Sequence, residues 1–350
     1  MKYFIVIVLA SLLLAASCEK QQTSVVSDPN PYYRIMFYNT ENLFDAVNDP
    51  LINDEEFLPT STKKWTEKRY QEKLDHIAKV IRDLGNDTLP IMVGLCEVEN
   101  RKTVDDLIGK TFLNGSDYKV IHHESPDSRG IDVALLYRSR YFQLLDSHFI
   151  KIHYPVDTTF KTREILYAHG ILGGKDTIHV FVNHWPSRSS GEVQTRPLRV
   201  FVAETVKSKV DSILLKSPSA QIVITGDFND EPMDLSVVSG LKAMLTYVNP
   251  SPSKLYDLTN QLKKGKPGGS YKYKGTWSTL DHMVVSGSLL DTTRILYSKP
   301  ADLHVFQASY LLEADKENLG ERPLRTYMGN FYQGGYSDHL PVYLDIRYRK

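Results

Sequence analysis

Hydrophobic and polar positions follow one another along this chain in short periodic runs that predict strands and helices in alternation. The runs "YRIMFYN" (33–39) and "LPIMVGL" (89–95) have the apolar, β-forming composition of strands. Between them, apolar residues recur at the spacing of one helix face, with Thr66 as a candidate N-cap and Gly85 as a stop signal. A strand, a helix and a buried strand are therefore expected in this order.

The same pattern continues to the C-terminus without internal repeats. A second, longer helix is expected over about 193–214, where apolar residues keep helical spacing after Pro197. Strands plus helices separated by polar loops indicate an α/β or α+β domain whose helices cover the sheets. The further predicted strands are "IDVALLYR" (131–138), "REILYAHGIL" (163–172), "TIHVFVNHW" (177–185), "QIVITGDFND" (221–230), "LDHMVVS" (280–286) and "LPVYLDIRY" (340–348).

The N-terminus carries an export signal. A basic start, an apolar run from Phe4 to Ala16 and the letters "LAASC" before Cys18 resemble a bacterial lipoprotein signal peptide. The resemblance implies that residues 1–17 are removed and that Cys18 is lipidated, which leaves 18–31 as a flexible tether and 32–350 as the folded domain. A secretory signal cut elsewhere, or an uncleaved anchor, is the alternative. Every version exports the protein.

Composition narrows the function classes. The 350 residues contain 42 Lys plus Arg and 42 Asp plus Glu, so no strong positive field marks a protein that coats nucleic acid, although a local basic patch remains possible. The histidines and the two cysteines show no zinc-type spacing, and Cys96 is expected to be a buried thiol.

Carboxylate, carboxamide and imidazole side chains gather at the predicted strand ends. One such residue would be an ordinary cap or turn, but a whole set suggests a site. A hard divalent ion prefers oxygen ligands, so one or two carboxylates together with a substrate phosphate form a sufficient metal site. The set suits the attack of water on a phosphoester. Its members are Asn39, Glu41, Glu97, His184, Asp227, Asn229, Asp281, Asp338 and His339.

Seven motifs occur in the order typical of the endonuclease/exonuclease/phosphatase superfamily, which the chain resembles from Tyr33 to Arg349. The resemblance implies a four-layer α/β/β/α sandwich of two packed mixed sheets flanked by helices. It also implies a metal-dependent phosphoester hydrolase that uses Mg²⁺ or Mn²⁺. The motifs are "FYNTENLF", "GLCEVEN", "RGIDVALLYR", "VNHWPSR", "GDFND", "LDHMVVS" and "YSDHLPV".

The resemblance also implies roles for individual residues. Glu97 is expected to bind the metal, with Glu41 and Asp338 assisting, while Asn39 orients the site or binds substrate. Asp227 and Asn229 are expected to align or activate the nucleophile. His184 is expected to contact the phosphate. Apart from the resemblance, Arg188 and Asn183 are expected to contact substrate, with an ordinary surface arginine as the alternative for Arg188.

The letters Asp-His occur twice, at Asp281-His282 and Asp338-His339. Successive side chains of a regular strand point to opposite faces, so Asp281 and His282 cannot both face one site. The resemblance pairs Asp281 with the catalytic His339 instead. His282 is then expected to be a packing or surface residue.

The substrate stays open at this stage. A nuclease-like phosphodiesterase acting on nucleic acid is expected first, and a phosphatase or a sphingomyelinase-like enzyme is the alternative. A non-catalytic surface lipoprotein with the same fold is the second alternative. The protein is expected to be an exported monomer, held in the bacterial cell envelope by a lipid on Cys18, on the periplasmic or outer side of the outer membrane.

Overall fold

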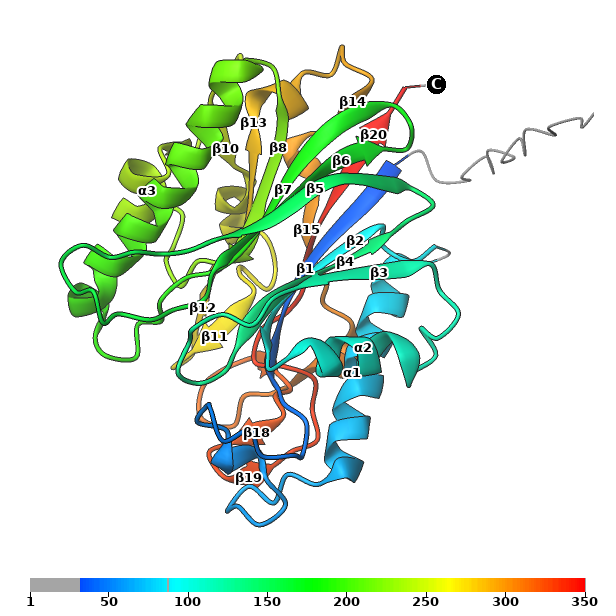
Figure 1. The fold of residues 1–350 in the computed structure, drawn as a ribbon, viewed down its shortest axis with the longest axis vertical. Coiled ribbons are helices and arrows are strands. Elements are labelled where there is room, and N and C mark those ends of the chain that lie inside the picture. The colour runs from blue at the N-terminus through cyan, green and yellow to red at the C-terminus, as the bar shows by residue number, and fades with distance from the viewer. Residues whose placement is uncertain (1–31, 87, 350) are drawn as a thin grey trace, which may run out of the picture. The chain divides into compact units, whose positions relative to one another are not determined.

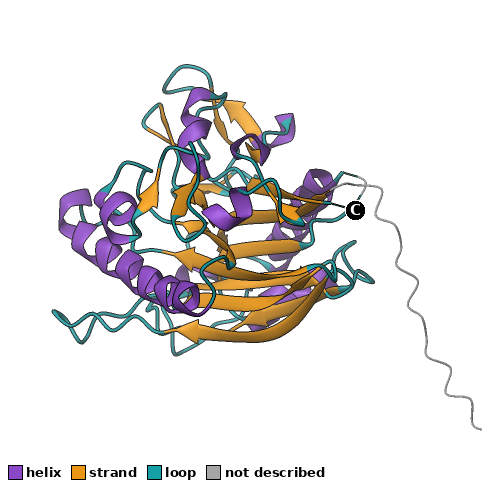
Figure 2. Ribbon diagram, turned by 90° about the horizontal axis from the view of Figure 1, so that it is seen from above, coloured by secondary structure: helices purple, strands orange, loops and turns teal. Residues whose placement is uncertain are grey.

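Two mixed β-sheets packed face to face form the centre of the computed structural model, which describes residues 32–86 and 88–349. The predicted signal peptide (1–17) and tether (18–31) lie outside the described residues. The first sheet has the order β14-β20-β1-β2-β4-β3, with β15 paired to β20, and the second has the order β5-β6-β7-β8-β13-β10-β9. Helices lie on both sides of this pair of sheets (Figures 1 and 2).

The elements have the following bounds. The first sheet contains β1 (Tyr32–Leu43), β2 (Met92–Val98), β3 (Tyr118–His122), β4 (Asp132–Arg138), β14 (Leu296–Tyr297), β15 (Leu303–Val305) and β20 (Val342–Tyr348). The second contains β5 (Phe142–Ile150), β6 (Ile165–Leu172), β7 (Asp176–His184), β8 (Gln221–Asp227), β9 (Ala243–Met244), β10 (Leu255–Asp257) and β13 (Asp281–Ser286). The α-helices are α1 (Glu67–Gly85), α2 (Arg101–Gly109) and α3 (Glu192–Lys216). Small hairpins are formed by β11 (Tyr271–Tyr273) with β12 (Thr276–Ser278), β16 (Leu312–Ala314) with β17 (Glu321–Pro323), and β18 (Tyr327–Met328) with β19 (Phe331–Tyr332).

Alternation along the strands divides the apolar side chains among three core layers. Phe37 of β1 and Val182 of β7 belong to the layer between the sheets. The neighbouring residue on β1, Tyr38, faces the other way and packs in the cluster that contains the apolar stripe of α1. On the second sheet, Phe181 packs in the cluster that contains Val206 of α3. The predicted four-layer α/β/β/α sandwich is therefore confirmed.

The helix predictions hold at their starts. The side chain of Thr66 accepts a hydrogen bond from the Arg69 amide, so it caps α1 as expected. Asn100 caps α2 in the same way through the Thr103 amide, at 2.9 Å. The helix expected over 193–214 is α3, which contains Pro197 near its start. In the described residues no helix has the length and apolar character needed to cross a membrane.

Strand direction brings the predicted strand-end residues to one edge of the molecule. β1 runs parallel to β2, and β7 runs parallel to β8, so these strands end at the same edge of their sheets. β20 is antiparallel to β1, and β13 is antiparallel to β8, so both begin where the other strands end. Side chains at the ends of β1, β2, β7 and β8 therefore lie at the same edge as side chains at the start of β13 and just before β20.

Candidate active site

An aspartate–histidine pair lies at the centre of this edge. Nδ1 of His339 is 2.7 Å from Oδ2 of Asp281, and the same oxygen accepts a hydrogen bond from Oγ of Ser270 at 2.5 Å. Burial alone would lower the pKa of His339, but the nearby charges of Asp281, Asp227 and Asp338 outweigh it and raise that pKa to about 10. The imidazole is therefore a cation at neutral pH.

Asp227 faces this cation across a short gap. Its Oδ2 is 3.8 Å from Nε2 of His339 and accepts a hydrogen bond from Nδ2 of Asn39 at 3.1 Å. Its Oδ1 accepts the backbone amide of Asn229 at 2.9 Å. Burial raises the pKa of Asp227 to about 7, with the His339 cation opposing the rise and the Asp281 charge adding to it. Asp227 can therefore exchange a proton near neutral pH.

Glu97 supplies a carboxylate that is still open to solvent, with 16% of its side chain exposed. Its Oε2 accepts the Asn42 amide at 3.0 Å, and its Oε1 lies 3.4 Å from Nδ2 of Asn39. The Asn39 carboxamide thus contacts both Glu97 and Asp227, which fits the orienting role expected for it. Asp338, also partly exposed, lines the same pocket as Glu97.

Glu41 does not join Glu97, which corrects the expectation of a metal ligand at this position. Its Oε2 accepts the backbone amide of Thr326 at 2.6 Å, and its Oε1 lies 3.2 Å from Nε of Arg325. The side chain is buried, and it does not line the pocket that contains Glu97. Arg325 also donates to Oδ2 of Asp338 at 2.7 Å, so the guanidinium bridges the two carboxylates.

His184 reaches the pocket as a neutral imidazole. Its Nε2 is 3.8 Å from Oδ2 of Asp227 and 3.9 Å from Oε1 of Glu97. Burial, together with the positive charges of Arg163, Arg129 and His339, holds the pKa of His184 well below its usual value. Any contact with a phosphate is therefore made by a neutral donor rather than by a cation.

Asn183 is the second correction, because its side chain cannot contact substrate. It is completely buried; its amide donates to the carbonyl of Thr225 at 3.1 Å, and its oxygen accepts from Nε1 of Trp185 at 3.2 Å. Trp185 is itself buried and stacks on Phe228. Asn183 therefore fixes the aromatic packing beneath the site.

Arg188 and Asn229 both line the pocket, and the Arg188 side chain is hydrogen-bonded to the Asn229 backbone. Nε of Arg188 donates to the carbonyl of Asn229 at 2.5 Å, while its NH2 group is paired with Asp230 at 2.8 Å and with Asp234 at 2.5 Å. The Asn229 carboxamide donates to the carbonyl of Trp185 at 3.1 Å. A third carboxylate, that of Glu192, lies 3.2 Å from the NH1 group, so the guanidinium is already balanced and Arg188 chiefly secures the loop after β8.

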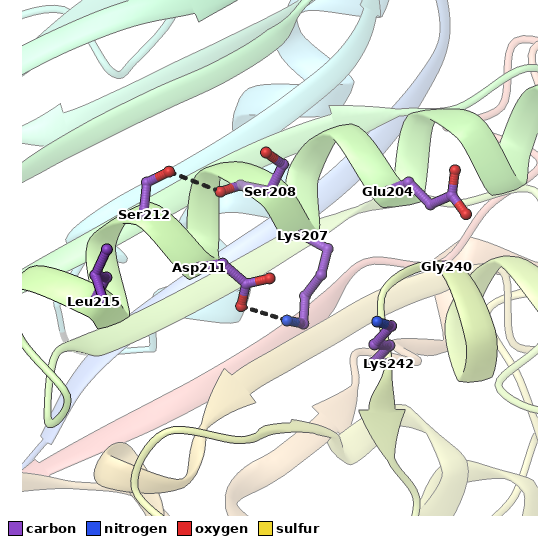
Figure 3. A pocket seen from close by; sticks show the side chains of 8 residues that line it. All are labelled: Glu204, Lys207, Ser208, Asp211, Ser212, Leu215, Gly240 and Lys242. Atoms are coloured by element: carbon purple, nitrogen blue, oxygen red, sulfur yellow. Dashed lines mark hydrogen bonds and ion pairs between the residues drawn. The ribbon is translucent and has the colours of Figure 1, made fainter.

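One pocket of about 620 Å³ is lined by Glu97, His184, Asp227, Asp338 and His339, among other residues. Its chemistry combines carboxylates, the His339 cation and the guanidinium groups of Arg129 and Arg188. Another hollow lies on the exposed side of α3 (Figure 3), but there Lys207 is paired with Asp211 on the same helix and Ser212 bonds to the carbonyl of Ser208. The residues lining the first pocket are Glu97, Arg129, His184, Ser187, Arg188, Ser189, Glu192, Asp227, Asn229, Tyr271, Tyr273, Ser278, Leu280, Asp338 and His339.

Sequence reasoning missed Arg325, Ser270 and Tyr271. Ser270 bonds to Asp281, and Tyr271 forms a β-bridge with His339 and packs its ring 4.7 Å from the imidazole. All three come from irregular segments or short hairpins, where periodicity carries no signal. In the sequence, the alternating tyrosines and lysines of "SYKYK" (270–274) are the feature that could have pointed to Ser270 and Tyr271.

The donor set fits a hard divalent cation. Glu97 and Asp338 present partly exposed carboxylates to one pocket, and Mg²⁺ or Mn²⁺ is bound by one or two carboxylates with water and substrate oxygens. In contrast, Asp227, Asp281 and His339, whose ligand atoms lie within 4.8 Å of one another, already satisfy each other as an ion-paired group.

The structure defines the fold class as a sandwich of two mixed sheets flanked by helices, with this pocket at one edge of the sheets. The chain belongs to the endonuclease/exonuclease/phosphatase family, whose model matches residues 34–348. Members of this family are generally hydrolases that act on phosphoesters with divalent metal ions. A search among curated proteins found no match.

Solved structures share the fold at low sequence identity. A humanized D. rerio TDP2 is 15% identical, with a TM-score of 0.57, over 91% of this chain and 100% of the other. The human Nocturnin catalytic domain with bound sulfate is 17% identical, with a TM-score of 0.52, over 92% of this chain and 96% of the other. A family protein from Bacteroides thetaiotaomicron is 15% identical, with a TM-score of 0.54, over 91% and 95%.

Proposed function

We propose that the protein is a divalent-metal-dependent phosphodiesterase of the nuclease-like kind. The observation that carries the proposal is the opposition of Asp227 and the His339 cation in one pocket, with Nε2 and Oδ2 separated by 3.8 Å. A carboxylate whose pKa lies near 7 suits a general base, and a fixed imidazolium suits the charge that develops on a phosphoryl oxygen. A binding module has no need of both.

The chain's own residues divide the work of water attack. Asp227, oriented by Asn39 and by the Asn229 amide, accepts the proton of the attacking water. The His339 cation, held by Asp281, donates a hydrogen bond to a non-bridging phosphate oxygen. The bond between phosphorus and the leaving oxygen breaks, and the proton taken up by Asp227 returns through solvent to that oxygen. Glu97 and Asp338 would hold Mg²⁺ or Mn²⁺, which supplies a Lewis acid for the phosphoryl oxygens when bound.

Nucleic acid is the proposed substrate class. One solved structure with this fold is D. rerio TDP2 complexed with a single-strand DNA product, at 14% identity and a TM-score of 0.55 over 91% of this chain and 100% of the other. The exposed Tyr273 and the half-exposed Arg129 at the pocket add an aromatic surface and a cation, which suit a base and a phosphate of a single strand.

A substrate panel with matched variants tests this proposal. The purified domain is assayed with plasmid DNA, single-stranded DNA, RNA, sphingomyelin and inositol phosphates in Mg²⁺ or Mn²⁺. His339→Ala should reduce kcat by ~10²–10⁴-fold, the range of acid–base and charge stabilisation. His304→Ala, an exposed histidine outside the pocket, is the control. Wild-type activity in His339→Ala would sink the mechanism, and inactivity on every substrate would favour a binding protein.

We also propose that Cys18 anchors the protein, as a monomer, in the bacterial cell envelope. The letters "LAASC" after an apolar run support this proposal. Cys18→Ser should move the protein from the membrane fraction to the soluble exported fraction, as followed by immunoblot. A Cys18→Ser protein that stays in the membrane would contradict the lipid anchor. Surface proteolysis of intact cells then tells the periplasmic from the outer side.

A further inference from the structure

A second group of metal-binding side chains lies outside the pocket, between β3, β4 and the start of α2. β3 ends at His122 and β4 begins at Asp132, with Glu124 in the loop that joins them. One ligand atom from each of these residues lies within 4.8 Å of the other two. β3 and β4 are neighbouring strands at the edge of the first sheet, and α2 lies beside them (Figure 1).

The His122 imidazole is buried without a partner for one of its nitrogens. Its side chain is 1% exposed, and Nε2 has no hydrogen-bond partner among the described residues. This nitrogen faces Oδ2 of Asp132 at 3.4 Å. The contact does not form a hydrogen bond, and a buried imidazole nitrogen without one is costly, so a cation held between this nitrogen and the carboxylate would satisfy both.

The other oxygen of Asp132 is already engaged, which fixes the direction of Oδ2. Oδ1 of Asp132 accepts hydrogen bonds from the Ser125 amide at 2.8 Å and from the Ser125 hydroxyl. The carboxylate therefore cannot rotate to improve the contact between Oδ2 and Nε2 of His122 without losing these two hydrogen bonds.

Glu124 brings a second carboxylate to the same place. Its Oε1 accepts the Arg101 amide at 3.1 Å and lies 3.9 Å from Nδ1 of His122. A carboxylate oxygen of Glu124 also lies within 4.8 Å of a carboxylate oxygen of Asp132, so two negative charges are crowded together. The guanidinium of Arg101 does not relieve this crowding, because its Nε is paired with Asp105 at 2.9 Å.

We propose that His122, Glu124 and Asp132 bind a divalent transition-metal ion, with Zn²⁺ or Mn²⁺ as the class of ligand. Bonds of about 2.1 Å at tetrahedral angles place two ligand atoms about 3.4 Å apart, which is the spacing between Nε2 of His122 and Oδ2 of Asp132. An imidazole with two carboxylates selects such ions over Ca²⁺ and Mg²⁺, which prefer all-oxygen sites. A water would complete the coordination at the exposed side of Glu124.

The bound ion has a structural role at the pocket. It joins the two ends of the loop between β3 and β4, and this loop carries Arg129 to the pocket wall. Asp132 is also paired in register with Val98, the residue that follows Glu97. Ion binding here therefore orders a segment next to the catalytic carboxylate without touching substrate.

Cobalt titration separates this site from the pocket. In a Glu97→Gln background, Co²⁺ should bind with visible absorption bands and be displaced by Zn²⁺. Adding Glu124→Gln should weaken Co²⁺ binding by about 10-fold or more, and adding His122→Ala should abolish the bands from this site. Cobalt bound by Asp227, Asp281 and His339 is the same in all three proteins, so the difference belongs to the proposed site.

The controls exclude a loss of folding. Glu124 is 61% exposed, so Glu124→Gln leaves packing intact, and thermal melts in chelator should match those of the background protein. His123→Ala, at the adjacent and half-exposed imidazole that faces Glu164, should bind Co²⁺ unchanged. If Glu124→Gln and His122→Ala bind Co²⁺ as tightly as the background, or if the background binds none, the site does not exist.

Discussion

Backbone conformation at single residues decides where side chains of the candidate site point. Glu97 and Asn229 have φ values of 58° and 52°, in the left-handed region that costs a non-glycine residue about 1–2 kcal/mol. On β2, Cys96 faces the core between the sheets, but Leu95 and Val98 both face the helix side. The bulge between Cys96 and Val98 thus turns Glu97 into the pocket.

This bulge explains what could and could not be predicted at the residue scale. Regular alternation was enough to separate Asp281 from His282: Asp281 bonds to His339, while His282 is buried and bonds to Asp257 on the other face. Their separation and the Asp281–His339 pairing are confirmed. Alternation fails at Glu41, because its φ of 50° directs the side chain to Arg325, a residue from an irregular segment.

The charge state of His339 gives a pH prediction. Asp281→Asn removes the largest charge that raises the pKa of His339, so this pKa should fall from about 10 toward its ordinary value of about 6.5. The alkaline limb of the pH–activity profile should move down with it. Because the folded pKa is raised, the cation stabilises the fold fully below about pH 6.5, and this stabilisation is lost as pH rises through about 10. Asp281→Asn should narrow the pH range over which the His339 cation stabilises the fold.

A second buried pair in the same chain is the matched control. Asp257 bonds to His282 at 3.0 Å outside the pocket, so Asp257→Asn should lower stability and leave the alkaline limb in place. Activity is measured well below the melting temperature of each variant, and NMR follows the His339 ring. An unshifted His339 titration in Asp281→Asn would refute the pairing's electrostatic role.

At the scale of elements, the strands were the predictable part of the site. The long apolar runs became β1, β2, β4, β6, β7, β8, β13 and β20, whose ends carry the pocket. β5 was missed because its residues are mostly half-buried or exposed, so its alternation is weak. The segments with short hairpins, which supply Ser270 and Arg325, were missed because their conformation depends on tertiary contacts.

Gly226 tests how closely β7 and β8 must approach before Asp227. A Cβ at Gly226 would lie 2.3 Å from the carbonyl oxygen of Asn183, and the glycine has a φ of 155°. Gly226→Ala should therefore cost about 1–3 kcal/mol of unfolding free energy, measured by urea denaturation, and lower kcat by displacing Asp227. Gly109→Ala is the control, because a Cβ there meets nothing within 4 Å. Equal stability of the two variants would show that the strands separate freely.

At the scale of the whole molecule, charge is balanced overall but not in the pocket. The chain has a formal net charge of zero, yet Glu97, Asp227, Asp281 and Asp338 meet at one edge of the sheets. Among the nearby cations, His339 is shared by Asp281 and Asp227, and Arg325 is paired with Asp338, so these four carboxylates carry more negative charge than the two cations balance. A divalent cation should relieve this excess.

Mg²⁺ should therefore stabilise the whole fold. A ligand that binds only the folded state at 100 times its Kd adds about 2.7 kcal/mol, so the Tm should rise with Mg²⁺ concentration. Glu97→Gln should remove most of this rise, since it deletes the carboxylate best placed for the ion. Glu313→Gln, at a carboxylate paired with Arg322 at 2.8 Å outside the pocket, should keep the Mg²⁺-dependent rise in Tm.

Differential scanning calorimetry measures the rise in Tm. The site beside His122 contributes little to this rise because that site disfavours Mg²⁺. An equal Mg²⁺ response in wild type and Glu97→Gln would place the ion elsewhere and remove Glu97 from the metal site.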